Sequence, residues 1–81
     1  MYTKVQFGKD LKQRVFERKN IEFMGRWVFS AYSKHISDVE DGLIDIALDL
    51  SIMELGPEFA YSYEELDQIA DDLIAGKDVK L

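Results

Sequence analysis

The chain contains no cysteine and a single histidine, His35. Without cysteine it has no disulfide framework, no cysteine-based zinc site and no thiol nucleophile. One histidine excludes a histidine pair, and a histidine near the apolar face of a helical stretch is typical of a structural side chain that bonds a carbonyl. Glycines are isolated, so no phosphate-binding loop is present. We therefore predict that the protein is not an enzyme, with no catalytic residues, no metal site and no cofactor.

Long apolar runs are also missing. No stretch approaches the 18 apolar residues of a membrane-spanning helix, and the N-terminus shows no signal-peptide pattern. We expect a soluble, cytoplasmic protein that does not bind membranes. The 81 residues, of which 47% are hydrophobic, predict one domain over residues 1–81.

Lysine and arginine are missing from residues 35–76, although this stretch contains twelve acidic residues. Residues 1–26 carry a net charge of +4, and residues 27–81 carry −10. Nucleic-acid binding requires a basic face, so direct nucleic-acid binding is not expected. Two interpretations remain. A basic N-terminal helix neutralises the acidic helices within the chain, or the acidic half is matched to a basic protein partner.

Residues 37–57 have the clearest helical pattern. Ser37 and Glu40 have the spacing of a capping box, while Gly56 as a left-handed cap and Pro57 predict the end. A helix is expected at about 38–55. One apolar face contains Val39, Leu43, Ile46, Ala47, Leu50 and Met53, and a second contains Ile44, Leu48, Ile52 and Leu55. A surface helix has a single apolar stripe, so the second face predicts a central buried helix or a helix that contacts a partner.

Three further helices are expected, at about 8–19, 21–35 and 62–75. The start of the first is ambiguous, because residues 1–7 suit an extended segment, and Thr3 with Gln6 also suits an earlier helix start. Ser62 and Glu65 form a second capping box.

Together these patterns predict an all-α fold, a small four-helix bundle or orthogonal bundle, with residues 1–7 and 77–81 as frayed ends. The alternative is three helices with an extended N-terminal segment.

Two acidic rows and one aromatic residue are the candidate partner-binding residues. The rows are Asp41, Asp45 and Asp49 on the third helix, and Glu64, Asp67 and Asp71 on the fourth. Like charges at i, i+4 repel by a few tenths of a kcal/mol, and a helix with only a structural role more usually includes lysine. The rows are either a solvated acidic face that the basic N-terminal helix neutralises or a surface matched to a basic partner. Trp27 is either core, together with Phe23, or an exposed anchor of the kind found at binding hot spots.

The format of the chain is small, acidic, helical and free of cysteine. It resembles the format of bacteriocin-type immunity proteins, although no residue motif carries the resemblance. The expected function is a small acidic binding protein that occludes a basic protein partner, such as an immunity protein or antitoxin that neutralises a toxic nuclease. The alternative is a structural or regulatory homodimer, which associates through Ile44, Leu48 and Ile52 across a two-fold axis.

Overall fold

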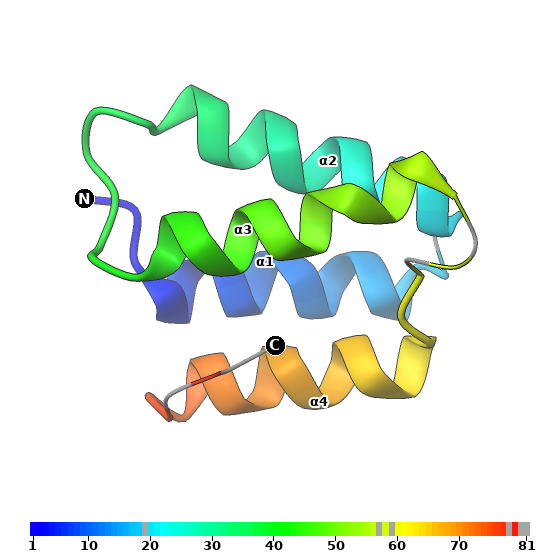
Figure 1. Cartoon of the computed structure of the whole chain (residues 1–81). Coiled ribbons are helices and arrows are strands. Elements are labelled where there is room, and N and C mark those ends of the chain that lie inside the picture. Colours follow the sequence, from blue (N-terminus) through cyan, green and yellow to red (C-terminus); the bar gives the residue numbers. More distant parts are fainter. Residues whose placement is uncertain (19, 57, 59, 78, 80–81) are drawn as a thin grey trace.

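The computed structural model describes residues 1–18, 20–56, 58, 60–77 and 79. These residues form four α-helices and one short 3-10 helix. In chain order the elements are α1 (Lys4–Phe16), α2 (Ile21–Lys34), α3 (Leu43–Ser51), η1 (Ile52–Leu55) and α4 (Tyr63–Ile74). Consecutive α-helices run in opposite directions along a common axis (Figure 1). The predicted all-α four-helix bundle is therefore confirmed.

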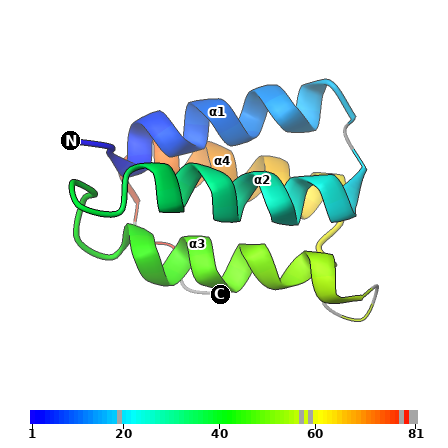
Figure 2. The ribbon, with the colours of Figure 1, turned by 90° about the horizontal axis from the view of Figure 1, so that it is seen from above.

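The helices pack in two pairs, with α1 along α4 and α2 along α3 and η1. Figure 2 shows α2 between α1 and α3 when the bundle is seen from above. One apolar face of each α-helix supplies the core, and no polar side chain of the described residues is buried. The core residues include Phe7, Leu11 and Val15 of α1, Met24 and Val28 of α2, Leu43, Ile46, Ala47 and Leu50 of α3, and Leu66, Ile69, Ala70 and Leu73 of α4.

The first helix begins at Lys4, so the predicted start at residue 8 is wrong and the alternative start at Thr3 is right. The Thr3 hydroxyl accepts a hydrogen bond from the Gln6 N–H at 3.1 Å. The predicted fraying of residues 1–7 is also wrong, since Tyr2 is buried and forms an isolated parallel bridge with Val39. The end of the predicted helix at residue 19 lies outside the described residues, and α1 itself ends at Phe16.

The third helix begins at Leu43, not at residue 38, and its N-cap is Gly42 with φ 87°. The Glu40 carboxylate does not close a capping box on Ser37. It accepts a hydrogen bond from the Lys4 N–H at 2.9 Å, at the N-terminus of α1. The backbone of Tyr2 bonds the residues on both sides of Val39, which holds this segment extended. A tertiary contact has therefore displaced a local helix start.

The far end of this helix also differs from expectation. The α-helix ends at Ser51 and continues as η1, and Gly56 has an extended backbone with φ 161° instead of a left-handed one. The predicted stop at Pro57 lies outside the described residues. One face of α3 is buried as predicted, but Leu48, Ile52 and Leu55 on the second face are exposed. No other described helix covers that face.

The fourth helix agrees with the sequence. Ser62 and Glu65 form the predicted capping box, with both hydrogen bonds present. Gly76 follows the helix with φ 78°, in the left-handed region expected after a helix end. Of the predicted frayed tail, Lys77 lies 3.9 Å from an Asp72 oxygen and Val79 packs against the core, while residues 78, 80 and 81 lie outside the described part of the chain.

Candidate partner-binding surface

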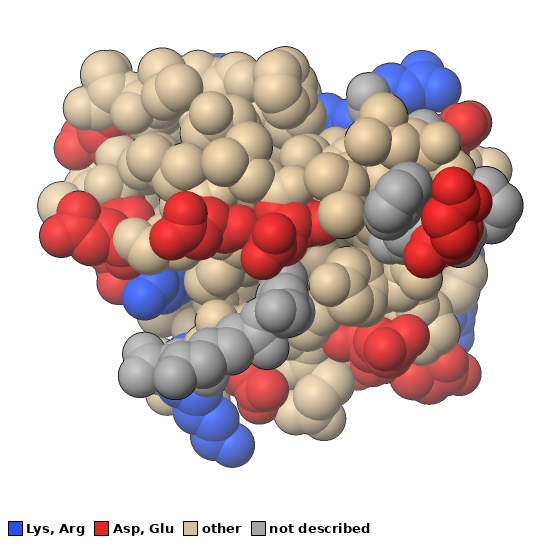
Figure 3. All heavy atoms as spheres, viewed as in Figure 1, with Lys and Arg blue, Asp and Glu red and all other residues tan. Residues whose placement is uncertain are grey.

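The α3 acidic row consists of Asp41, Asp45 and Asp49, and all three side chains are exposed. Asp45 and Asp49 lie on α3 itself, whereas Asp41 lies in the turn before Gly42, not on the helix as predicted. Figure 3 shows a continuous band of carboxylates over α3. Within the described part of the chain, no hydrogen bond or ion pair reaches any of the three. No described cation therefore forms an ion pair with the row, although the Lys4 ammonium lies beside Gly42, the residue that follows Asp41.

The acidic row on α4 is in a different situation. Lys12 of α1 places its Nζ 3.1 Å from Asp67 Oδ1 and 2.6 Å from Asp71 Oδ1. These hydrogen bonds, to Asp71 first and then to Asp67, raise the pKa of the Lys12 ammonium. Two of the three predicted residues are thus paired within the chain, as the intramolecular interpretation expects, and Glu64 is exposed beside them.

An uncharged surface lies next to the α3 acidic row. Leu48 is 42% exposed and Ile52 39%, with Ile44 half-buried one turn before them. At 100° per residue, Asp45 is about 60° around the helix from Leu48, and Asp49 is about 60° from Ile52. Figure 3 shows a broad area without charged side chains on the side of the acidic band toward α2.

The helix α2 extends this uncharged area. Phe29 of α2 is 53% exposed, and Ile36, in the turn after α2, is 55% exposed. Phe29 is two residues from Trp27 and therefore points to nearly the opposite side of the helix. Because Trp27 stacks on Phe7 of α1, Phe29 faces away from α1, on the side where α3 lies (Figure 2). We use the term α3 face for this set: the α3 acidic row together with Ile44, Leu48, Ile52, Phe29 and Ile36.

Trp27 does not belong to the α3 face. Its ring is half-buried and stacks on Phe7 with centroids 5.7 Å apart, and the Arg14 guanidinium lies over it at 5.3 Å. The structure therefore separates Trp27 from the acidic rows and shows it packed against α1. Its predicted partner, Phe23, is partly exposed.

A second cluster ties the N-terminus to the loop between α2 and α3. The Tyr2 ring stacks on His35 at 4.3 Å, and its hydroxyl donates a hydrogen bond to Asp10 Oδ2 at 2.8 Å. Burial and this hydrogen bond raise the pKa of the Tyr2 hydroxyl. The Met1 ammonium lies 3.2 Å from Asp38. His35 is structural as predicted, but its contact is an aromatic ring instead of the expected carbonyl.

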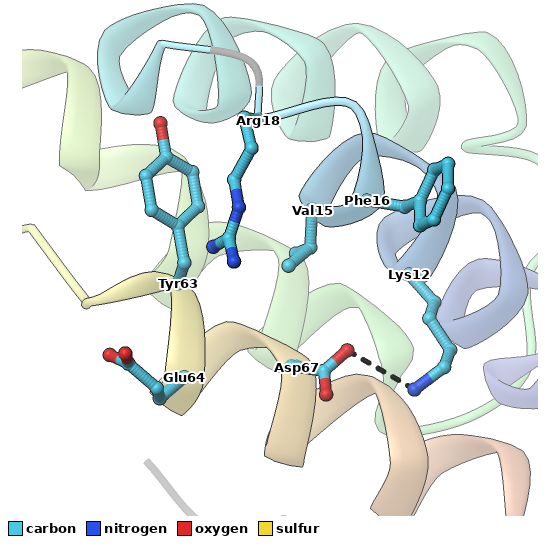
Figure 4. A pocket seen from close by; sticks show the side chains of 7 residues that line it. All are labelled: Lys12, Val15, Phe16, Arg18, Tyr63, Glu64 and Asp67. Atoms are coloured by element: carbon cyan, nitrogen blue, oxygen red, sulfur yellow. Dashed lines mark hydrogen bonds and ion pairs between the residues drawn. The ribbon is translucent and has the colours of Figure 1, made fainter.

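Sequence reasoning missed a hollow of about 450 Å³ between the end of α1 and the start of α4. Figure 4 shows Arg18 beside Tyr63, and the two groups are 5.0 Å apart in a cation–π contact. Phe16 lines the hollow at one edge and is 82% exposed. The sequence contains a sign of this exposure. Phe16 directly follows Val15, the last residue of the buried face of α1, so the two side chains point to different sides of the helix.

The described residues contain no group of three or more potential metal ligands, and none of their helices is long and apolar enough to cross a membrane. Comparison of the chain with family models, with curated proteins and with solved structures finds no match. The assignment of function therefore rests on the α3 face itself.

Proposed function

We propose that this chain is a small acidic binding protein that occludes a basic protein partner with its α3 face, as an immunity protein or antitoxin covers a toxic nuclease. One observation carries the proposal: the α3 acidic row has no partner among the described residues, whereas the α4 row is paired by Lys12. Both rows belong to the same acidic chain, so the difference between them is local.

Electrostatics supports this assignment. Asp45 and Asp49, an i, i+4 pair on α3, repel each other by a few tenths of a kcal/mol, and Asp41 in the preceding turn adds a third exposed carboxylate. A basic partner relieves that repulsion. Complementary charge also speeds the encounter of two proteins and suppresses association with acidic ones. The uncharged part of the α3 face then supplies the apolar contact that charge alone does not provide.

A homodimer through the same face is the second candidate, because Leu48 and Ile52 are exposed. A two-fold axis that pairs two α3 helices in antiparallel fashion places both acidic rows on the same flank of the interface. The rows then repel, so such a dimer is strengthened by salt. Binding to a basic partner is weakened by salt, and the two candidates therefore have opposite salt dependence.

The test uses two matched variants that remove two negative charges each. Asp45→Asn with Asp49→Asn changes the α3 row, and Glu17→Gln with Glu64→Gln changes two exposed acids at the end of α1 and the start of α4. Proteins retained by the immobilised wild type at about 50 mM salt are identified, purified and titrated against all three forms at about 50 and 500 mM salt. Light scattering of the chain alone measures self-association.

The proposal expects a basic protein that binds the wild type and the Glu variant equally and binds the α3 variant about tenfold more weakly at low salt. If that protein is a nuclease, its activity falls in the same order. Equal binding by the two variants, the absence of a stoichiometric basic partner, or a dimer that strengthens with salt each overturns the proposal.

A further inference from the structure

We infer that the element recognised by the α3 face is an amphipathic helix with a basic flank, lying alongside α3. This inference rests on the proposed function and names the kind of partner segment that the surface fits. The α3 face has three parts: an acidic row, an apolar stripe, and an aromatic border formed by Phe29 of α2 with Ile36 of the following turn. A matching helix has a basic flank, an apolar stripe and an uncharged flank in the same order.

The backbone of the α3 face explains why the partner segment is helical. Both α2 and α3 satisfy their backbone groups internally, and among the described residues only Tyr2 and Val39 form a β-bridge. An extended segment that docks on such a surface gains no backbone hydrogen bonds and leaves its own groups unpaired. A helix arrives with its backbone bonds already made, and its side chains at i, i+3, i+4 and i+7 provide the contacts.

The length of the surface sets the length of the partner. Leu43–Leu55 spans α3 and η1, and thirteen residues of helix extend about 20 Å. The exposed apolar side chains recur every third or fourth residue along it, as Ile44, Leu48, Ile52 and Leu55. A partner helix of about 12 to 15 residues, or three to four turns, covers this length.

The position of the carboxylates sets the charge of one flank. Asp45 and Asp49 lie on the same side of the apolar stripe, and the opposite side is bordered by Phe29 of α2 and by Ile36 in the turn after α2. Lysine or arginine on one flank of the docked helix meets the acidic row, while uncharged side chains on the other flank meet the aromatic border. A helix with basic residues on both flanks gains less, because half of its charge lies over uncharged surface.

The probe is a synthetic 15-residue helix, acetylated and amidated, with leucines every third or fourth position and lysines along one flank. Three control peptides accompany it: the same composition in scrambled order, a proline in place of the central leucine, and glutamate in place of each lysine. Binding is measured by fluorescence anisotropy, induced helicity by circular dichroism, and the site by backbone amide shifts on the intact chain.

We expect the probe to bind with a gain of helicity and to shift amides in residues 29–36 and 43–55. The scrambled, proline and glutamate peptides are expected to bind at least about tenfold more weakly than the probe. The variant with Asp45→Asn and Asp49→Asn is expected to bind the probe about five- to tenfold more weakly than the wild type does. Leu48→Ser tests the apolar stripe and is expected to have a similar effect. Because Leu48 is 42% exposed, its replacement is expected to leave the fold intact, and circular dichroism checks this.

Equal binding of the proline peptide overturns the helical inference, and amide shifts confined to α1 and α4 overturn the site. Self-association of the chain through the α3 face, seen as the same shifts on dilution without peptide, overturns the choice of occupant. If a purified basic protein depends on Asp45 and Asp49 but the probe does not bind, the helical inference fails and the proposed function stands. If binding of the basic protein and binding of the probe are both independent of Asp45 and Asp49, the proposed function fails as well.

Discussion

Replacing Gly8 with alanine tests helix propensity against tertiary packing. The two effects predict changes of opposite sign in the free energy of unfolding. Alanine favours a helix over glycine by about 1 kcal/mol, so Gly8→Ala would stabilise α1 in isolation. In the bundle, however, a Cβ at residue 8 lies 2.9 Å from Leu73 Cβ, 3.0 Å from the Ala70 carbonyl oxygen and 3.1 Å from Ile74 Cγ1. Backbone and Cβ atoms cannot rotate away, so α1 and α4 must move apart.

The magnitude follows from these two effects. Overpacking of a well-packed interior costs about 1–3 kcal/mol, and the gain in helix propensity offsets about 1 kcal/mol of it. The difference between these terms is about 0–2 kcal/mol. Because the atoms nearest the new Cβ are a Cβ and a backbone oxygen, we expect Gly8→Ala to lower the free energy of unfolding by about 2 kcal/mol. A domain of 81 residues has a total of roughly 4–12 kcal/mol, so this loss is readily measured, with a fall in Tm of several degrees.

The assay is urea unfolding followed by circular dichroism, for the wild type and the variant under identical conditions. A peptide of residues 1–18 with and without the substitution is the control for propensity, and there the substitution should increase helicity. If Gly8→Ala stabilises the whole chain, α1 and α4 do not approach as closely as the packing of Gly8 requires, and the reasoning is refuted.

Three further predictions concern the ends of the helices and are measured by the same unfolding assay. Tyr2→Phe removes the hydrogen bond to Asp10 and should cost about 1 kcal/mol of stability near neutral pH. Because the folded state raises the Tyr2 pKa above its ordinary value of 10.0, the wild type should lose stability more steeply than this variant as the pH rises above that value. Parallel stability profiles of the two proteins would contradict the assignment. Ser62→Ala should cost about 1 kcal/mol of stability and Ser37→Ala almost nothing, because of these two serines Ser62 alone caps a helix. Equal losses would show that both capping boxes form. Glu40→Ala should cost about 1 kcal/mol by removing the acceptor at the start of α1, and no loss would remove that role.

The candidate site was partly accessible from the sequence. The lack of lysine and arginine in residues 35–76 pointed to the acidic rows, and helical spacing pointed to the second apolar face of the third helix. What the spacing did not show is that Lys12, 55 residues before Asp67 in the chain, lies between Asp67 and Asp71. Pairing between helices depends on their packing, so a charge pattern along one helix does not reveal which carboxylates are already neutralised.

The aromatic border shows the same division. Phe29 lies about 100° around α2 from the buried Val28, but the neighbour that this side of α2 faces depends on the positions of α1 and α3. The stacking of Trp27 on Phe7 decides it. For the same reason Trp27 was a candidate anchor on sequence grounds and is a half-buried packing residue in the folded chain.

The sequence by itself determined the elements whose causes are local. The apolar periodicity gives the four helices and their buried faces, and the capping box at Ser62 gives the start of α4, because these depend on residues three or four positions apart. The tertiary structure decided the rest. Tyr2 holds residues 38–40 extended and Glu40 caps α1, so α3 starts at Leu43 instead of following the capping-box pattern at Ser37. Which acidic row is paired and which apolar face is exposed follow from how the two helix pairs pack, because those contacts join residues far apart in the chain.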